Sequence, residues 1–303
     1  MPLAPRSILA CILPAFLLAA CSKSKEELPT EPEIQQTVYT IGGDRPATLK
    51  LPMGYDSMGS LPVVISLHGY SGNPAGHDAY WGLSERVDVD NFALILPAGT
   101  RDLSGVRFWN ATDFCCDFFE SGVDDVAYLS DLIEETGEYI QVDRIFSVGH
   151  SNGGFMSYRL ACEGLPGLTA IAPLAGTSFL DPTRCESAPP VSVLHIHGTD
   201  DDIILYAGTT DGTGYAGAED VVERWAERAG CDLSSAEELP PIDIDNAHDG
   251  AETGRIRYRE GCQDGITVEL WKINEGSHGP WLTSDYAERL IDWLLNESRT
   301  KVS

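Results

Sequence analysis

Residues 144–154 have the sequence RIFSVGHSNGG, which predicts a strand, a sharp turn and a helix in immediate succession. The apolar run 144–148 is typical of a buried strand, and residues 152–161 have a helical pattern. Between them, GHSNG (149–153) matches G-x-S-x-G, the turn on which a nucleophilic serine stands strained and exposed. Glycine two residues to either side of the serine lets strand and helix pass closely. Ser151 is therefore the predicted nucleophile.

Apolar runs and helical patterns alternate on both sides of this turn. The order favours right-handed crossovers and a mostly parallel central sheet with helices on both faces, and with the serine turn it predicts the α/β-hydrolase fold. Residues 234–254 are acidic and without apolar pattern, so a loop is expected there. The predicted strands are 37–40, 47–51, 61–67, 92–96, 144–148, 168–174, 190–196 and 266–273, and the predicted helices are 78–90, 122–140, 152–161, 218–229 and 284–295.

A serine hydroxyl is a poor nucleophile unless a base takes its proton and a carboxylate orients that base. In this fold the three residues occur in the order serine, acid, histidine. His278 lies in a glycine-flanked loop after the last predicted strand and is the predicted base. The sequence DDD (200–202) follows strand 190–196, at the sheet edge where the acid is expected. The other histidines of these segments, His150, His195 and His197, are expected to pack in the core or to support loops.

The tetrahedral intermediate of acyl transfer needs two backbone N–H donors. One is predicted to be the amide of Asn152, directly after the nucleophile. The other should come from the loop after strand 61–67, where HGYSG (68–72) can turn its amides toward the serine, and Tyr70 is the predicted donor. A plain tight turn at residues 68–69 is compatible with this role.

The first 36 residues are expected to direct export rather than to join the fold. Residues 1–20 combine a basic side chain, an apolar run and small residues before Cys21, as in a secretory signal peptide. The sequence LAAC (18–21) resembles a bacterial lipobox, which implies a lipid anchor on Cys21, and a plain secretory signal is the alternative. Residues 21–36 are polar and proline-containing, as in a flexible tether. One catalytic domain is then expected over 37–303, either lipid-anchored at the outer membrane or cell surface, or secreted.

Composition narrows the possible partners. The formal net charge of −27 argues against binding nucleic acid, whose phosphates it would repel. The cysteines and histidines lack zinc-ligand spacing, and residues 234–254 lack the spacing of a calcium loop, so neither a metal nor a cofactor is expected. Six cysteines follow Cys21, and an even number suggests disulfides in an exported domain. The residue pattern leaves open whether Cys115 and Cys116 pair with each other.

Together these motifs resemble the poly(3-hydroxybutyrate) depolymerase-like and feruloyl esterase-like family of secreted α/β-hydrolase serine esterases. The resemblance implies that Asp201 is the acid, with Asp200 as the next candidate, and that Cys231 is joined to Cys262. With that bridge we expect two others, Cys162–Cys185 and Cys115–Cys116. The matching segments are LHG (67–69), FWN (108–110), CC (115–116), GVDDV (122–126), GHSNGGFM (149–156), HG (197–198), Cys262 and GSH (276–278).

The resemblance implies a carboxylic ester hydrolase that works through an acyl-enzyme on an ester substrate. Feruloyl or acetyl esters on polysaccharide are favoured over poly(3-hydroxybutyrate) or other hydroxyalkanoate oligomers. Trp109 and Trp281 are expected either to line the substrate pocket or to pack ordinarily. The carboxylates of VDDV (123–126) should cap a helix or fix the cysteine loop. The alternative of another class is a surface lipoprotein that binds glycans or a protein through an inactive hydrolase pocket. Oligomeric state is not defined by the sequence.

Overall fold

The computed structural model describes residues 37–55, 59–209 and 213–298, so the predicted signal peptide, lipid site and tether lie outside the described residues. Two of its strands, β5 (Thr100–Arg101) and β6 (Arg107–Phe108), form a small hairpin of their own. The strands of the main sheet are β1 (Thr37–Ile41), β2 (Ala47–Leu51), β3 (Ser60–Leu67), β4 (Ala93–Leu96), β7 (Gln141–His150), β8 (Leu168–Leu174), β9 (Ser192–Gly198), β10 (Glu237–Ile242), β11 (Thr253–Tyr258) and β12 (Val268–Ile273).

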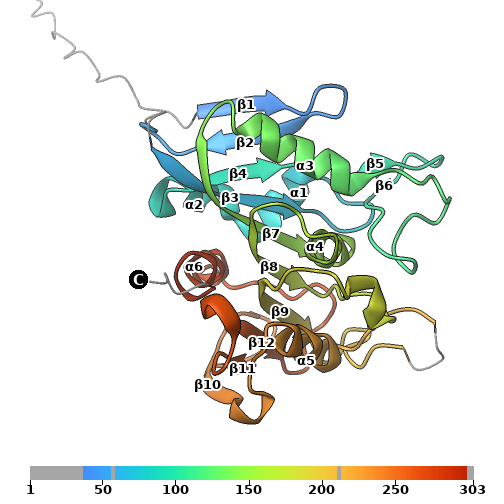
Figure 1. The fold of residues 1–303 in the computed structure, drawn as a ribbon, viewed down its shortest axis with the longest axis vertical. Helices are drawn as coiled ribbons and strands as arrows, with labels where there is room; N and C mark the ends of the chain where they lie inside the picture. The colour runs from blue at the N-terminus through green and yellow to red at the C-terminus, as the bar shows by residue number, and fades with distance from the viewer. Residues whose placement is uncertain (1–36, 56–58, 210–212, 299–303) are drawn as a thin grey trace, which may run out of the picture. The chain divides into compact units, whose positions relative to one another are not determined.

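The main sheet has the strand order β1-β2-β4-β3-β7-β8-β9-β12-β11-β10 (Figure 1). The six central strands from β4 to β12 pair in parallel, and an antiparallel hairpin closes each edge. Strands β4 and β9 are buried along their whole length, which explains their unbroken apolar character. The loops that follow the central strands therefore gather at one edge of the sheet.

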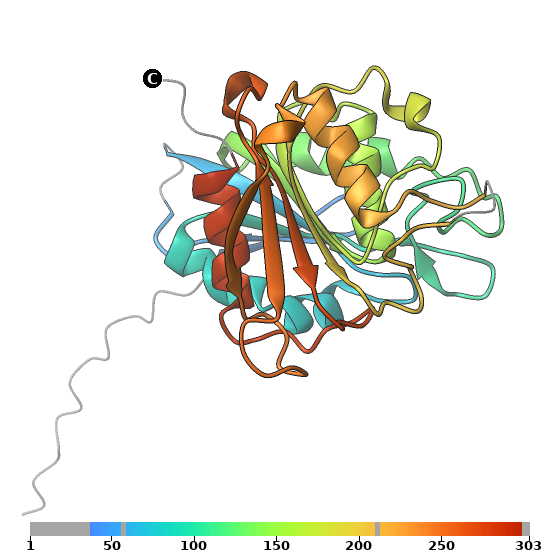
Figure 2. The same cartoon turned by 90° about the horizontal axis from the view of Figure 1, so that it is seen from below.

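Helices cover both faces of this sheet (Figures 1 and 2). One face packs against α1 (Pro74–Trp81), α2 (Leu83–Asp90) and α6 (Tyr286–Asp292), which continues into the π-helical turn η4 (Trp293–Glu297). The other face packs against α3 (Asp125–Thr136), α4 (Asn152–Cys162) and α5 (Ala218–Arg228). Three short 3-10 helices are η1 (Pro182–Cys185), η2 (Leu233–Ser235) and η3 (Gln263–Gly265). The predicted α/β fold is confirmed. No helix within the described ranges has the length and apolar character needed to span a membrane.

Two sequence predictions about the elements are wrong. The helix predicted over 78–90 is two helices, because Gly82 takes a left-handed conformation (φ 71°) that ends α1 before α2 begins. The loop predicted over 234–254 contains the edge strand β10 and leads into β11, which was not predicted. Strand β10 is largely exposed and carries Pro240 and Pro241, which only an edge strand tolerates, so its sequence lacks an apolar signal.

Three disulfides join the six cysteines in the described part of the chain. They are Cys115–Cys116, Cys162–Cys185 and Cys231–Cys262, the pairs expected from the sequence. The second ties the end of α4 to η1, and the third ties the segment after α5 to the start of η3. The first lies in the loop between β6 and α3, beside the candidate active site.

Candidate active site

Ser151 stands between the last residue of β7 and the first residue of α4. Its backbone is in the positive-φ region (φ 54°, ψ −119°), which L-residues rarely adopt. Its N–H donates to the carbonyl of Leu174 in β8 (2.8 Å), so the neighbouring strand holds the strained turn in place. This is the geometry that the GHSNG sequence predicts.

The glycines of the turn have no room for a side chain. A Cβ atom added at Gly149 would overlap the carbonyl of Gly153, and one added at Gly153 would overlap the carbonyl of Leu67 in β3. Strand β7 and helix α4 can therefore meet at this angle only with glycine at both positions.

Asp201 and His278 are hydrogen bonded at the carboxyl edge of the sheet. His278 Nδ1 lies 2.8 Å from Asp201 Oδ2, although the two residues come from the loops after β9 and β12. The other carboxylate oxygen accepts the backbone N–H groups of Ile203 (2.9 Å) and Ile204 (2.8 Å). Asp201 is only 3% exposed, whereas Asp200 is exposed, so Asp201 is the acid placed to orient His278.

The charge state of Asp201 follows from these contacts. Burial raises the pKa of the carboxyl group, but hydrogen bonds from His197, from His278 and from the amide of Ile204 outweigh burial and hold the pKa below its usual range. Asp201 is therefore an anion at neutral pH. Because its partner is anionic, His278 carries its proton on Nδ1 and its lone pair on Nε2.

His150 connects the serine turn to the histidine loop. Its Nε2 lies 2.8 Å from the carbonyl oxygen of His278, and the two rings are 4.9 Å apart. Burial is the main cause that lowers the pKa of His150 to about 4, so the ring is neutral at pH 7 and donates through Nε2. The loop that carries His278 is thereby tied to the residue next to Ser151, and His278 stays the predicted base.

Trp109 is hydrogen bonded both to Asn152 and to the start of the loop that carries Tyr70. The side chain of Asn152 accepts the Trp109 N–H (2.7 Å) and donates to its carbonyl (2.9 Å). The indole N–H of Trp109 donates to the carbonyl of His68 (2.9 Å), at the start of the loop that carries Tyr70. A Cβ added to Gly69 would be 3.4 Å from Ser151 Cβ, so this loop runs directly beside the serine. The amides of Tyr70 and Asn152 stay the predicted donors.

The sequence leaves two roles open for each of two tryptophans, lining the substrate pocket or packing ordinarily. Trp109 is completely buried (0% exposed), so of the two alternatives it packs ordinarily and does not line the pocket. The sequence FWN (108–110) alone does not distinguish a tryptophan buried in the core from one that lines a pocket. Trp281 is 70% exposed, three residues after His278, and its backbone N–H donates to Asp245 Oδ1 (2.8 Å).

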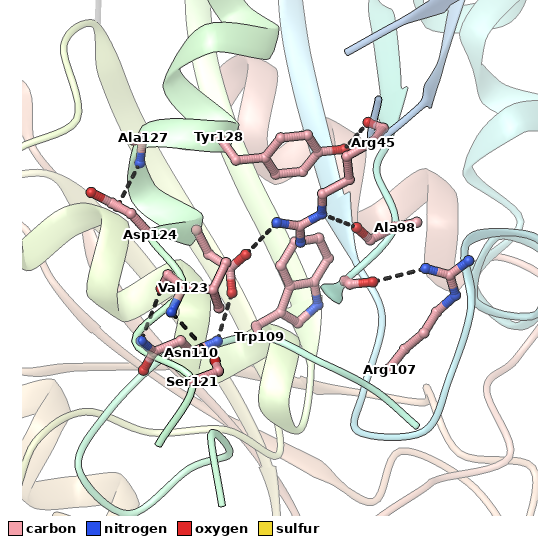
Figure 3. A network of polar contacts seen from close by, with 12 residues as sticks. Arg45, Ala98, Arg107, Trp109, Asn110, Ser121, Val123, Asp124, Ala127 and Tyr128 are labelled. Atoms are coloured by element: carbon pink, nitrogen blue, oxygen red, sulfur yellow. Dashed lines mark hydrogen bonds and ion pairs between the residues drawn. The ribbon is translucent and has the colours of Figure 1, made fainter. Parts of the chain in front are cut away.

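A polar network around Arg45 and Asp125 fixes the segment that contains Trp109 (Figure 3). Arg45 contacts Asp125 Oδ1 through Nη1 (2.5 Å) and donates from Nε to the carbonyl of Ala98 (2.8 Å). The other oxygen of Asp125 accepts the N–H of Asn110 (2.7 Å), next to Trp109. Asp124 caps α3 by accepting the N–H of Ala127 (2.9 Å). These carboxylates thus cap a helix and fix the cysteine loop, as the sequence predicts.

Exposed apolar side chains collect on the loops at the catalytic edge. Apart from Tyr70 and Trp281, the sequence analysis did not single them out, since isolated apolar residues in loops carry no periodic signal. Tyr70 and Phe118 pack edge to face (5.4 Å between ring centroids), and Phe114 packs on Tyr215 (4.8 Å). The large exposed apolar residues on these loops are Tyr70, Leu103, Phe114, Phe118, Phe119, Ile203, Leu205 and Trp281.

Among the described residues, His, Cys, Asp and Glu side chains form no group of three or more that could hold a metal ion. The chemistry available at the site is that of a serine, an imidazole and a buried carboxylate. The fold and this arrangement define the class: α/β-hydrolases with a candidate serine–histidine–aspartate triad.

Comparison with known proteins finds feruloyl esterases among the relatives of the chain. No family model matches the chain. Feruloyl esterase B of Piromyces equi is 25% identical over 245 residues, which cover 77% of this chain and 42% of that protein. Feruloyl esterase D of Neurospora crassa is 24% identical over 288 residues, which cover 90% of this chain and 87% of that protein.

Solved structures agree on the fold. An acetyl xylan esterase from Aspergillus awamori superposes with a TM-score of 0.59 at 14% identity, over 86% of this chain and 98% of that one. A mutant feruloyl esterase module from Clostridium thermocellum superposes with a TM-score of 0.53 at 12% identity, over 88% and 89%. The chain is therefore similar in sequence to feruloyl esterases, and it shares the α/β-hydrolase fold of these esterase structures.

Proposed function

We propose that this protein is an exported serine esterase that hydrolyses aromatic acyl esters of the feruloyl kind carried on polysaccharide. The observation that carries the proposal is the 2.8 Å hydrogen bond between Asp201 and His278, at the sheet edge where β7 ends in the strained turn of Ser151. Relatives named as feruloyl esterases support the choice of ester.

The first half of the reaction acylates the serine. His278 Nε2 takes the proton of Ser151 Oγ as the oxygen attacks the ester carbonyl, and Asp201 stabilises the imidazolium that forms. The carbonyl oxygen becomes an oxyanion that the amides of Asn152 and Tyr70 bind. When the C–O bond breaks, the imidazolium gives its proton to the leaving alcohol, and the acyl group stays on Ser151.

The second half returns the free enzyme. Water gives a proton to His278 Nε2 and attacks the acyl carbonyl, the same two amides hold the second oxyanion, and Ser151 leaves with the proton from His278. The products are one carboxylic acid and one alcohol. Neither half requires a metal or a redox group.

The aromatic side chains beside the site support an aromatic acyl group. Phe114 contacts both Tyr215 and Phe155 (6.4 Å between the Phe114 and Phe155 ring centroids), and Phe155 lies one helical turn after Ser151. Stacked and edge-on aromatic pairs are each worth about 0.5–1.5 kcal/mol beyond area burial. An aromatic acid can gain such contacts here, whereas an acetyl group cannot.

The experiment compares methyl ferulate, methyl acetate and a 3-hydroxybutyrate oligomer on the purified domain. We expect kcat/KM to be highest for methyl ferulate and to vanish for all esters in Ser151→Ala. Phe114→Ala should lower kcat/KM about 3- to 10-fold for methyl ferulate but not for methyl acetate. Val89→Ala, which truncates an exposed apolar residue on α2, is the control. Preference for the hydroxybutyrate oligomer would instead assign polyester turnover, and inertness of Ser151 would favour a binding protein.

Export and lipid attachment form part of the same proposal. The sequence of residues 1–21 supports it, as do three disulfides, which are typical of proteins outside the reducing cytosol. In a bacterial host, Cys21→Ala should move the protein from the membrane fraction to the soluble fraction and abolish incorporation of labelled palmitate. An unchanged distribution would contradict the lipid anchor.

A further inference from the structure

Three buried titratable side chains lie next to the triad and have no part in the reaction described above. His195 and His197 are two residues apart on β9, so their side chains leave the same face of the sheet. Tyr158 comes from α4, the helix that begins at the serine turn. All three are completely buried (0% exposed).

These side chains form a continuous chain of polar contacts that ends at Asp201. Tyr158 Oη lies 2.9 Å from His195 Nδ1, and His195 Nε2 lies 3.1 Å from His197 Nδ1. His197 Nε2 faces two acceptors, the carbonyl of Ile204 at 2.8 Å and Asp201 Oδ2 at 3.2 Å. Asp201 Oδ2 is also the oxygen that binds His278.

When both imidazoles are neutral, one arrangement of protons gives every contact a donor, with the single Nε2–H of His197 shared between the Ile204 carbonyl, which is nearer, and Asp201 Oδ2. The Ile204 carbonyl and the Asp201 carboxylate only accept, so His197 must carry its proton on Nε2. Its Nδ1 then has a lone pair and accepts from His195 Nε2–H. His195 Nδ1 is in turn an acceptor, and the Tyr158 hydroxyl donates to it. Burial strongly lowers the pKa of His195, which keeps that ring neutral.

We propose that His197 is a positioning residue for the triad, and that Tyr158 and His195 act through it by fixing its tautomer. His197 Nε2–H holds Asp201 Oδ2 opposite His278, so the carboxylate cannot turn away from the histidine it orients. The inference rests on the proposed function only in that the triad is taken to be active. It does not depend on which ester is the substrate.

The contacts to Asp201 show why this support is needed. Oδ1 is held by the two amides of Ile203 and Ile204, and Oδ2 lies between two imidazoles. A buried carboxylate is costly unless each lone pair meets a donor. Without His197, Oδ2 keeps only the bond to His278, whose ring must also move as it exchanges protons with Ser151. We therefore expect loss of His197 to affect kcat rather than KM.

The test compares His197→Leu, which removes the donor, with His197→Gln, whose side-chain amide can place an N–H near the position of Nε2. We expect His197→Leu to lower kcat about 10- to 100-fold, as loss of an outer-shell support typically does, with little change in KM. His197→Gln should restore most of kcat. The rate at which a fluorophosphonate labels Ser151 should follow kcat, and this second readout needs no ester substrate. Melting temperatures show whether each variant is folded.

A double-mutant cycle tests whether Tyr158 acts on the triad through His197. Tyr158→Phe removes only the terminal hydroxyl, and it should slow kcat and Ser151 labelling in the wild-type background. In the His197→Leu background the same change should have no further effect, because Tyr158 then has no tautomer to fix. Tyr286→Phe is the matched control, since it removes another fully buried hydroxyl, one that has no hydrogen-bond partner among the described residues.

Two outcomes would overturn the proposal. Wild-type kcat in a folded His197→Leu variant would show that Asp201 needs no second imidazole. Additive losses from Tyr158→Phe and His197→Leu would show that Tyr158 acts through packing and not through His197. If the wild-type protein hydrolyses no ester but Ser151 is labelled rapidly, the proposed function fails while the labelling rates still test the positioning role.

Discussion

The side chain of Asn152 forms two hydrogen bonds with the backbone of Trp109, to its N–H at 2.7 Å and its carbonyl at 2.9 Å. These are the bonds that a neighbouring strand would supply to an extended segment. Both residues are completely buried, and the Trp109 indole continues the contact to the carbonyl of His68. Asn152 therefore has two roles. Its backbone N–H is a predicted oxyanion donor, and its side chain fixes the Trp109 segment, which in turn holds the loop of the other predicted donor, Tyr70.

Asn152→Ala should consequently impair stability and catalysis together. It leaves the buried N–H of Trp109 without a partner, at about 1–3 kcal/mol, whereas the Trp109 carbonyl keeps the backbone N–H of Cys116 (3.3 Å). We expect the free energy of unfolding, measured in urea, to fall by about 1–3 kcal/mol, and kcat to fall although the backbone amide of residue 152 itself is retained. Asn246→Ala, at an exposed site where the side chain donates to the carbonyl of Leu282, should change neither value. Unchanged stability in Asn152→Ala would mean that water or another group replaces the amide.

Separate substitutions of Asp200 and Asp201 test which of the two is the acid of the triad. Asp201→Asn keeps the shape of the side chain but removes the anion that fixes the His278 tautomer, and in a serine–histidine–aspartate triad this change lowers kcat about 10⁴-fold. Asp200 is exposed, and its nearest side-chain contact is Thr199 at 3.4 Å. Asp200→Asn should therefore keep near wild-type kcat. A larger loss in Asp200→Asn than in Asp201→Asn would reverse the assignment.

The close approach of β3 and α4 predicts a sharp difference between two glycines. A methyl group at Gly153 would overlap the backbone carbonyl of Leu67, which no rotamer can relieve, whereas Gly279 has no atom within 4 Å of an added Cβ. Gly153→Ala should lower the melting temperature and abolish esterase activity, because the serine turn must open to fit it. Gly279→Ala, directly after His278, should keep both. A fully active Gly153→Ala would show that the turn is less constrained than its contacts indicate.

The central sheet and the serine turn could be predicted because each carries a local signal. The run at 144–148, the glycines around Ser151 and the histidine loop after the last strand each define their own structure within a few residues. The order of the triad then follows from the fold. The local pattern alone could not distinguish Asp201 from Asp200, because three adjacent aspartates are equivalent in sequence. They differ only in the folded structure, where Asp201 is buried and hydrogen bonded to His278.

What could not be predicted depends on contacts between distant segments. Trp109 is buried because Asn152, His68 and the Arg45–Asp125 pair close around it, and no spacing in the sequence relates these residues. Strand β10 pairs along an open sheet edge, so it needs no apolar alternation. The contacts from His197 to Asp201 and to His195 likewise appear only when β9 and the loop after it are folded together.

Buried neutral histidines predict that the protein loses stability in mild acid. The pKa of His68 is lowered to about 4, first by burial and then by Arg107 and Arg45, whereas an unfolded chain has a histidine pKa near 6.5. Between these values the unfolded state binds more protons than the folded state, so stability is complete above pH 6.5 and falls as the pH approaches 4. This shift corresponds to about 3 kcal/mol for His68 alone. Burial lowers the pKa of His77, His150 and His195 in the same direction.

His68→Gln provides the measurement for this prediction. His68 Nε2 accepts the N–H of Gly99 (2.9 Å), and a glutamine oxygen can accept the same bond without taking up a proton. We expect the melting temperature of the wild type to fall steadily from pH 7 to pH 4.5 and that of His68→Gln to fall less over the same range. Parallel curves for the two proteins would show that His68 is protonated without cost in the folded state. Curves that converge toward low pH would show that its burial as a neutral ring is one source of the acid sensitivity.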